Sequence, residues 1–181
     1  MEFQNCIESR RSIRRFTEQA VSKEQIEALV RAAAFAPSWK NSQTVRYHAV
    51  CSKALRERIA EEATFSFSKN RLNISGAPLL MVVTTVDGIS GYEPDGSPTT
   101  TKGSHWQSFD AGLSVENFVL AAAEMGLGSV ILGIFDEAKV REILQLPEGE
   151  SVSALIPVGY PAESPNCPKR KSVDELLTMH E

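Results

Sequence analysis

Apolar residues recur along the chain with two different periods, and each period predicts a kind of element. Spacings of three and four residues are typical of amphipathic helices, whereas short alternating or continuous apolar runs are typical of strands. Ser22 followed by Gln25 forms a capping-box pattern, and Ala36-Pro37 ends that helix because the residue before a proline avoids helical backbone angles. The predicted helices are a short one before residue 10 and segments 23–35, 52–63, 109–125, 136–146 and 173–179, and the predicted strands are segments 44–51, 78–86, 129–135 and 151–158.

Several segments depart from a simple amphipathic pattern. Residues 78–86 are apolar almost without interruption, which is typical of a central strand covered on both faces. The helix at 109–125 is apolar around most of its circumference, which predicts that a partner subunit covers its second face. Gly133 interrupts the strand at 129–135, either as a bulge or where another group approaches the backbone. Connections are predicted at 39–43 as a loop or single turn, at 64–75 as a helix end and connection, and at 87–103 as a long excursion rich in glycine and proline.

Length and composition are those of a soluble protein with one domain. The 181 residues suffice for one sizeable core, so we treat residues 1–181 as a single domain. The 42% apolar and 23% charged residues are ordinary for such a protein. No secretory signal and no membrane-spanning apolar stretch is visible, so we expect a cytoplasmic protein that does not bind membranes. The three cysteines lack a Cys-x-x-Cys spacing, which argues against a metal site or a redox dithiol.

The stretch Arg10-Arg11-Ser12-Ile13-Arg14-Arg15-Phe16 brings four guanidinium groups together without a carboxylate. Cations at the end of the first helix would face the negative end of its dipole, which explains one or two of these arginines but not four. A patch for nucleic acid is a second interpretation, and the net charge of -4 argues against it. A pocket for a small phosphate remains, because arginine offers planar bidentate donors and Ser12 adds a hydroxyl. A second basic cluster, Lys169-Arg170-Lys171, lies in a proline-rich tail, where charged segments are usually only solvated.

The chain carries no recognisable machinery for hydrolysis. Its three histidines are scattered, and it lacks the motifs of serine hydrolases, zinc proteases and phosphate-binding loops. Gly126-Leu127-Gly128 resembles half of a dinucleotide fingerprint, but it follows a helix and precedes a strand, which reverses the required order. A phosphate-binding protein without a nucleophile, a metal site or an acid–base pair is best explained if a cofactor supplies its reactivity.

Several short motifs together resemble the nitroreductase family of FMN-dependent oxidoreductases over almost the whole chain. Each motif is weak alone, and their order and spacing make the resemblance specific. The matching motifs are Arg10-Arg11-Ser12-Ile13-Arg14, Ala36-Pro37-Ser38-x-x-Asn41-x-Gln43, Ala77-Pro78, Asp110-x-Gly112, Gly126-Leu127-Gly128 with Leu132-Gly133, and Lys169-Arg170. The resemblance implies an α+β fold with a mixed, mainly antiparallel sheet flanked by helices. It also implies a homodimer with two FMN sites at its interface.

The resemblance assigns roles to individual residues, and none of them is a catalytic acid or base. The residues implied to hold the FMN phosphate and ribityl chain are Arg10, Arg11, Ser12 and Arg14, with Lys169 and Arg170 closing on the phosphate. The residues implied to meet the flavin ring are Asn41 and Gln43 from the partner subunit, Trp39 against the ring, and the backbone amides of Leu132 and Gly133 at the isoalloxazine edge. Preorganised donors at that edge would stabilise the negative charge of the reduced ring.

The implied activity is hydride transfer from NAD(P)H through flavin N5 to an electron-poor acceptor such as a nitroaromatic or a quinone. Two alternatives stay open, a specialised dehydrogenase or dehalogenase of the same family and an FMN storage or sensing module without turnover. The chain departs from the family at Thr44-Val45-Arg46, where a proline and an aromatic residue are common. A usual flavin contact before the central strand has no clear match, and the candidates are Lys69, Asn70 and Asn73. The candidates for an apolar roof over the flavin are Trp39, Phe65, Phe67 and Tyr92.

Overall fold

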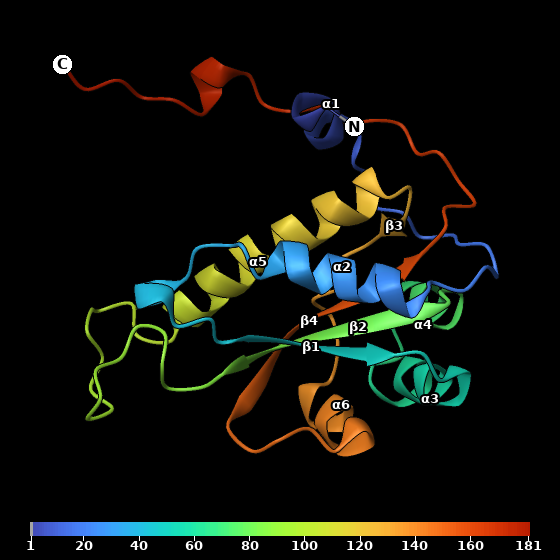
Figure 1. Ribbon diagram of the computed structural model, residues 1–181, viewed down its shortest axis with the longest axis horizontal. Helices are drawn as coiled ribbons and strands as arrows, with labels where there is room; N and C mark the ends of the chain where they lie inside the picture. The colour runs from blue at the N-terminus through green and yellow to red at the C-terminus, as the bar shows by residue number, and fades with distance from the viewer. Residues whose placement is uncertain (1) are drawn as a thin grey trace.

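The computed structural model describes residues 2–181 and shows an α+β fold built around a four-stranded sheet (Figure 1). The strand order is β1 (Val45–Val50), β2 (Leu79–Val86), β4 (Glu150–Gly159) and β3 (Gly128–Ser129), and neighbouring strands run antiparallel. An isolated parallel bridge joins Ser12 to Ser129. The predicted fold class, a mixed but mainly antiparallel sheet flanked by helices, is therefore confirmed.

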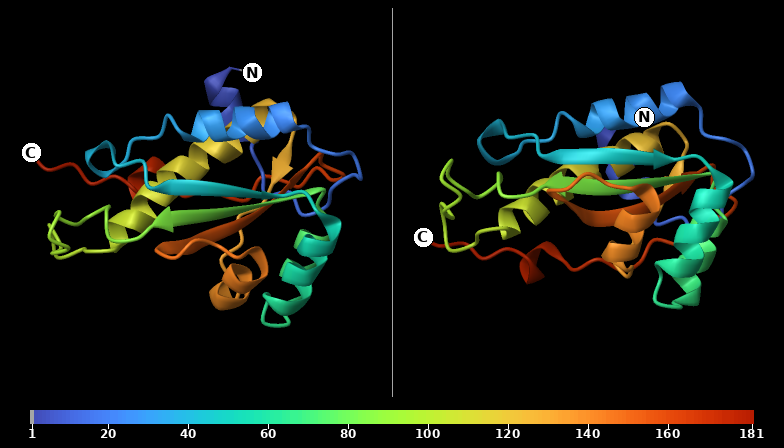
Figure 2. Two further views of the ribbon diagram at one scale, coloured as in Figure 1. Left: turned by 60° about the horizontal axis from the view of Figure 1, so that its bottom comes forward. Right: turned by 90° about the horizontal axis from the view of Figure 1, so that it is seen from below.

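Helices cover both faces of the sheet (Figure 2). One face carries α2 (Lys23–Ala33) and α5 (His105–Glu124), and the other carries α3 (Lys53–Glu62), α4 (Ser68–Ser75) and α6 (Glu137–Leu144). The short helix α1 (Phe3–Ser9) packs against α5, where Cys6 Sγ lies 3.3 Å from Leu120 O. Each helical layer encloses its own hydrophobic cluster, one around Phe118 and the other around Ile59. No helix within residues 2–181 is long and apolar enough to cross a membrane.

Side-chain caps confirm the predicted starts of α2, α3 and α6, whereas α5 begins at His105, four residues before the start predicted at 109. Ser22 Oγ accepts from Gln25 N–H at 3.2 Å, and Gln25 Oε1 accepts from Ser22 N–H at 3.0 Å. Ser52 and Asp136 cap α3 and α6 by accepting a backbone N–H three residues on. The central strand is confirmed as well, because β2 is buried at every position from Leu79 to Thr85. The turn η1 (Trp39–Asn41) is the single turn predicted at 39–43.

The prediction of a connection at 64–75 is wrong, because this segment contains the helix α4. Its buried residues include Asn70 and Asn73 beside Ile74, so the inward face of this helix is largely polar. An apolar periodicity is the main signal by which a sequence indicates a helix, and it is absent here.

The strand predicted at 129–135 is wrong beyond Ser129, after which only an isolated bridge joins Leu132 to Leu155. Val130 N–H donates to Pro157 O at 3.3 Å, but Pro157 has no N–H to return, so the ladder is interrupted. The helix predicted at 173–179 is also wrong and is reduced to the 3₁₀ turn η2 (Val173–Glu175). Most short helices are stabilised by burying an apolar face, and residues 171–181 are exposed and bury none.

Candidate functional site

The arginine-rich stretch lies beside the end of β4, where the C-terminal tail begins. Ile13 N–H donates to Ser129 O at 2.9 Å, and Thr17 N–H donates to Tyr160 O at 2.9 Å. Gly128 permits this close approach, because a Cβ at that position would lie 2.7 Å from side-chain atoms of Ile13. The start of the chain is thus held against the strand from which the tail departs.

The two basic clusters noted in the sequence contribute to one cavity of about 360 Å³. The N-terminal stretch supplies arginines and a serine, and the tail supplies an arginine, two prolines and an asparagine. The lining residues are Arg10, Arg11, Ser12, Arg14, Pro165, Asn166, Pro168 and Arg170. Lys169 is exposed and lies outside this lining. The tertiary structure therefore places cations from both ends of the chain around one space.

The arginines of this cavity differ in whether they already have partners. Arg11 Nη1 donates to Glu8 O at 2.6 Å and to Arg10 O at 2.7 Å, so this guanidinium caps the end of α1. Arg10, Arg14 and Arg170 form no ion pair with a carboxylate among residues 2–181. Guanidinium groups without anionic partners around one cavity are suited to bind a phosphate. The helix-capping interpretation thus accounts for Arg11. Of the other three, only Arg14 has an acceptor in the described chain, Ser12 O at 3.4 Å, so their guanidinium groups are largely available to a ligand.

The turn that carries Asn41 and Gln43 has an unusual backbone. Lys40, Asn41 and Gln43 are all left-handed, with φ of 47°, 56° and 49°. Such angles are uncommon for residues other than glycine and cluster at functional sites. The side chains of Asn41 and Gln43 are exposed, and Gln43 Nε2 donates to Asn41 Oδ1 at 3.3 Å. The turn therefore presents two amide side chains outward on a strained backbone.

Asp110 of α5 fixes this turn in place. Its carboxylate is 2% exposed, accepts from Trp39 N–H at 3.0 Å, and accepts from Ser90 Oγ–H at 2.7 Å. The Trp39 ring packs against Trp106 with centroids 4.9 Å apart. The Trp39 side chain is thus engaged within its own chain, and its predicted contact with a flavin ring stays a prediction.

One chain does not bring this turn to the arginine-lined cavity. The arginine-rich stretch leads into the N-terminal end of α2, and the turn follows its C-terminal end (Figure 1). The eleven residues of α2 span about 16 Å. The four predicted roof residues are divided in a similar way. Trp39 and Tyr92 line a cavity of about 450 Å³ at the turn, whereas Phe65 and Phe67 lie between α3 and α4. Within one chain, the predicted ring contacts and the arginines therefore lie apart.

The segment of Leu132 and Gly133 lies beside α4. Leu132 N–H already donates to Leu155 O at 2.8 Å, so this amide is not available to a ligand. Gly133 is exposed, and a Cβ there would meet nothing within 4 Å. Asn70 Nδ2 donates to Ile134 O at 2.8 Å and holds the segment. The backbone at Gly133 is therefore open to solvent, whereas the Leu132 amide predicted to face the flavin already has its acceptor in Leu155.

Asn73 is one of the three residues that the sequence offered as a flavin contact before the central strand, and the structure places it on α4. Its side chain is 6% exposed and makes no hydrogen bond with any of residues 2–181. Its amide atoms keep some contact with solvent, so they are available to a ligand. The spacing of three residues between Asn70 and Asn73 was the signal that they share one face of a helix.

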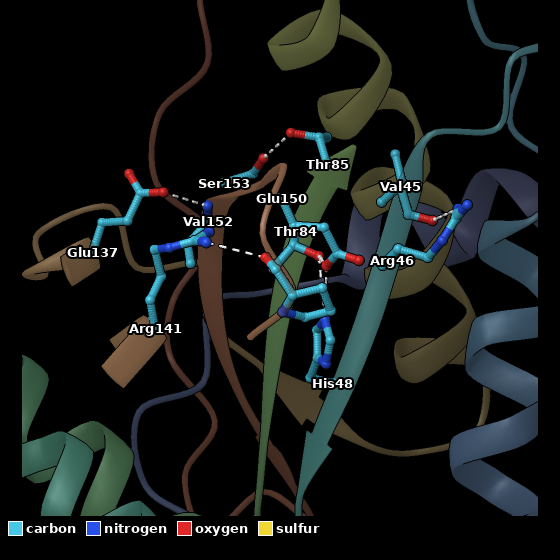
Figure 3. A network of polar contacts seen from close by, with 11 residues as sticks. Val45, Arg46, His48, Thr84, Thr85, Glu137, Arg141, Glu150, Val152 and Ser153 are labelled. Carbon is cyan, nitrogen blue, oxygen red and sulfur yellow. Dashed lines mark hydrogen bonds and ion pairs between the residues drawn. The ribbon is translucent and has the colours of Figure 1, made fainter. Parts of the chain in front are cut away.

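A second polar cluster joins three strands on the α3–α6 side of the sheet (Figure 3). His48 Nε2 lies 3.2 Å from Thr84 Oγ1 and 3.1 Å from Glu150 Oε2, and Thr84 Oγ1 donates to Glu150 Oε2 at 2.5 Å. Nearby, Glu137 Oε1 accepts from Val152 N–H at 2.8 Å. Within residues 2–181 no three His, Cys, Asp or Glu side chains gather closely enough to hold a metal ion. The side chains of His48, Thr84 and Glu150 thus form hydrogen bonds with one another.

The chain matches a known protein family over most of its length. Residues 7–71 and 69–160 match the family described as Nitroreductase family. A protein from Archaeoglobus fulgidus with the provisional name NADH dehydrogenase/NAD(P)H nitroreductase is 32% identical over 161 residues, which cover 87% of this chain and 84% of that protein. The NADPH-flavin oxidoreductase of Vibrio harveyi is 29% identical over 163 residues, which cover 88% of this chain and 66% of that protein. A crystal structure of a nitroreductase family protein from Streptococcus pneumoniae TIGR4 superposes with a TM-score of 0.85 at 25% identity, covering 99% of this chain and 100% of that one.

Proposed function

The chain belongs to the nitroreductase family, and on this premise we propose that it is an FMN-dependent oxidoreductase. It takes hydride from NAD(P)H and reduces a small electron-poor acceptor such as a nitroaromatic or a quinone. The observation that carries the proposal is the cavity in which Arg10, Arg14 and Arg170 have no anionic partner within the described part of the chain. When bound there, FMN would supply the redox chemistry, accepting the hydride and passing it on.

The residues at this cavity fit a phosphate monoester. Arg10, Arg14 and Arg170 offer charge-assisted donors, Ser12 offers a hydroxyl, and Lys169 lies next to Arg170 on the tail. Arg11 contributes less, because its guanidinium is bound to backbone carbonyls. Gly133 and Asn73 would hold the ring, because the open backbone at Gly133 would admit a flat group and the Asn73 amide has no partner within residues 2–181.

The proposed site is completed by a second copy of the chain. Asn41 and Gln43 lie on an exposed turn remote from the arginines of their own chain, so we assign them to the flavin held by the partner subunit. The exposed side of α5 offers a surface for pairing, with Phe109 57% exposed and Gly112 open to solvent. In a homodimer with two-fold symmetry, each chain contributes the same residues to the site of the other chain.

Anaerobic reduction of the FMN-loaded protein tests the proposed activity. We expect NADH or NADPH to bleach the flavin absorbance, and a nitroaromatic or quinone to restore it. One ring face used in turn by two substrates predicts ping-pong kinetics, with parallel double-reciprocal lines. A protein that binds FMN but is reduced by neither nicotinamide would be a storage or sensing module. Rapid reoxidation by an aryl halide alone would favour the dehalogenase alternative.

Gly112→Glu tests the shared site. A Cβ at this position meets nothing within 4 Å in the single chain, and replacing a helical glycine improves helix propensity, so the monomer fold should tolerate the change. We expect light scattering to show dissociation, and fluorescence to show loss of FMN. Gly112→Ala is the matched control and should remain dimeric. A wild-type monomer that binds FMN stoichiometrically would contradict the shared site.

A further inference from the structure

A single carboxylate oxygen joins the two halves of the arginine-lined cavity. Glu163 Oε1 accepts from Arg14 N–H at 2.6 Å and from Arg15 N–H at 3.2 Å. One residue earlier, Ala162 N–H donates to Arg15 O at 2.9 Å. As far as Glu163, the tail is therefore hydrogen-bonded to the basic stretch. Within the described chain, residues 164–181 form hydrogen bonds only among themselves.

The charge of Glu163 opposes the binding of an anion. Its side chain lines an adjoining cavity of about 380 Å³ together with Arg10 and Arg11, so it lies close to the proposed phosphate site. A carboxylate there repels a phosphate. Its contacts are to backbone amides and not to guanidinium groups, so it leaves the charge of the arginines uncompensated. If repulsion dominates, removing the Glu163 carboxylate should strengthen anion binding. If positioning dominates, removing it should weaken anion binding.

The segment after Glu163 supplies the tail's half of the cavity. Pro165 and Pro168 line it, and Arg170 brings a guanidinium to it. The two prolines restrict the backbone between Glu163 and Arg170, so fixing one end of this segment limits where the other end can lie. Glu163 is the last hydrogen-bonded anchor before Arg170. Its release would lower the effective concentration of Arg170 at the phosphate.

We propose that Glu163 is a positioning residue for the phosphate of the cofactor and acts by holding Arg170 over the cavity. The proposal rests on the proposed function, because it assumes that the cavity binds FMN. Glu163 and Arg170 then act as one unit. In a chain that lacks the Glu163 carboxylate, Arg170 adds little to FMN affinity.

The test measures dissociation constants for FMN and riboflavin by fluorescence quenching. Glu163→Ala removes the acceptor, and Glu163→Asp keeps the charge but is one methylene shorter, so we expect each to weaken FMN binding about ten-fold. Glu163→Gln keeps an acceptor oxygen in place without the charge, and should bind FMN within about three-fold of the wild type. Riboflavin, which lacks the phosphate, should bind all variants alike. The ratio of the FMN to the riboflavin dissociation constant is insensitive to a general loss of folded protein. Glu148→Ala, at an exposed carboxylate in the loop before β4, is the matched control.

A double-mutant cycle with Arg170→Ala tests the coupling. We expect the double variant to bind FMN no more than about two-fold more weakly than Glu163→Ala alone, because the two residues act together. Independent, multiplying effects would overturn the proposal. Tighter FMN binding by both Glu163→Ala and Glu163→Gln would overturn it too, since repulsion would then dominate. If Arg14→Ala leaves FMN affinity unchanged, the assignment of the cavity as the phosphate site is wrong. If Arg14→Ala weakens binding while Glu163→Ala and Glu163→Asp do not, only the positioning role fails.

Discussion

Two polar clusters of this molecule differ in where their partners come from. In the cluster of His48, Thr84 and Glu150, each side chain is hydrogen-bonded to another, and Thr84 is fully buried. In the arginine-lined cavity, the guanidinium groups of Arg10 and Arg170 have no acceptor in the described chain. Burying a polar group costs little free energy when its hydrogen bonds are made. An exposed cation is hydrated, and its donors remain available to a ligand. The first cluster links three strands of the sheet, and the second has guanidinium donors available to the phosphate that we propose binds there.

The positions of the two clusters in the fold agree with this difference. The His48 network joins β1, β2 and β4, so each member is fixed by a strand (Figure 3). The cavity is formed by a loop after α1 and by the tail, which meet only in the tertiary structure. A site on loops held against a rigid sheet is a common arrangement for binding. Substitutions in the two clusters should therefore change different measurable quantities.

The largest effect is expected from Arg14→Ala in the cavity. A hydrogen bond to a charged group contributes about 1.5–3 kcal/mol, so FMN affinity should fall by roughly ten-fold to a hundred-fold while thermal stability of the apoprotein is unchanged. Fluorescence quenching by FMN measures the affinity. Equal affinity in the variant and the wild type would remove the phosphate assignment.

Glu150→Ala should have the opposite profile. It leaves the buried Thr84 hydroxyl without its acceptor, at a cost of about 1–3 kcal/mol, so the melting temperature should fall while FMN affinity per folded protein stays unchanged. The double variant Thr84→Val/Glu150→Ala removes both partners and should recover part of the loss. A loss of FMN affinity in either variant would contradict the separation of the two clusters.

An internal hydroxyl pair predicts a pH effect of intermediate size. Burial raises the pKa of Tyr47 to about 12, although its hydrogen bond with Ser114 acts in the opposite direction. Because an unfolded tyrosine titrates near pH 10, this contribution to stability is complete below about pH 10 and is lost as the pH rises toward 12. At pH 11 the loss should be about 1.4 kcal/mol. Urea unfolding of Tyr47→Phe should lack this alkaline component, and an identical pH dependence in both proteins would show that Tyr47 is not its source.

The smallest effect is expected from Arg11→Ala, at the same cavity as Arg14. Its guanidinium is already bound to Glu8 O and Arg10 O, so its removal should cost about 0.5–1.5 kcal/mol of helix-end stability and change FMN affinity little. Hydrogen exchange of the amides of α1 measures the first effect. A loss of FMN affinity equal to that of Arg14→Ala would show that Arg11 leaves the helix end and binds the phosphate.

Local features of this protein could be predicted from its sequence because their physical causes lie within a few residues. The caps at Ser22, Ser52 and Asp136 start helices through a backbone amide three residues on. The apolar run of β2 indicates burial on both faces without reference to any other segment. The motifs that indicate the family are likewise short, and their order along the chain can be seen in the sequence without a structure.

Only the tertiary structure decided which polar groups remain available. The sequence did not distinguish Arg11 from Arg14, and both line the cavity. In the fold, Arg11 donates to two backbone carbonyls at 2.6 and 2.7 Å, whereas Arg14 has only one longer bond, of 3.4 Å to Ser12 O. The same holds for Leu132, whose amide is taken by Leu155 across the sheet edge, and for α4, whose buried asparagines hide its helical period. Whether a hydrogen-bonding group is free depends on atoms that approach it from distant parts of the chain, and a sequence does not state those distances.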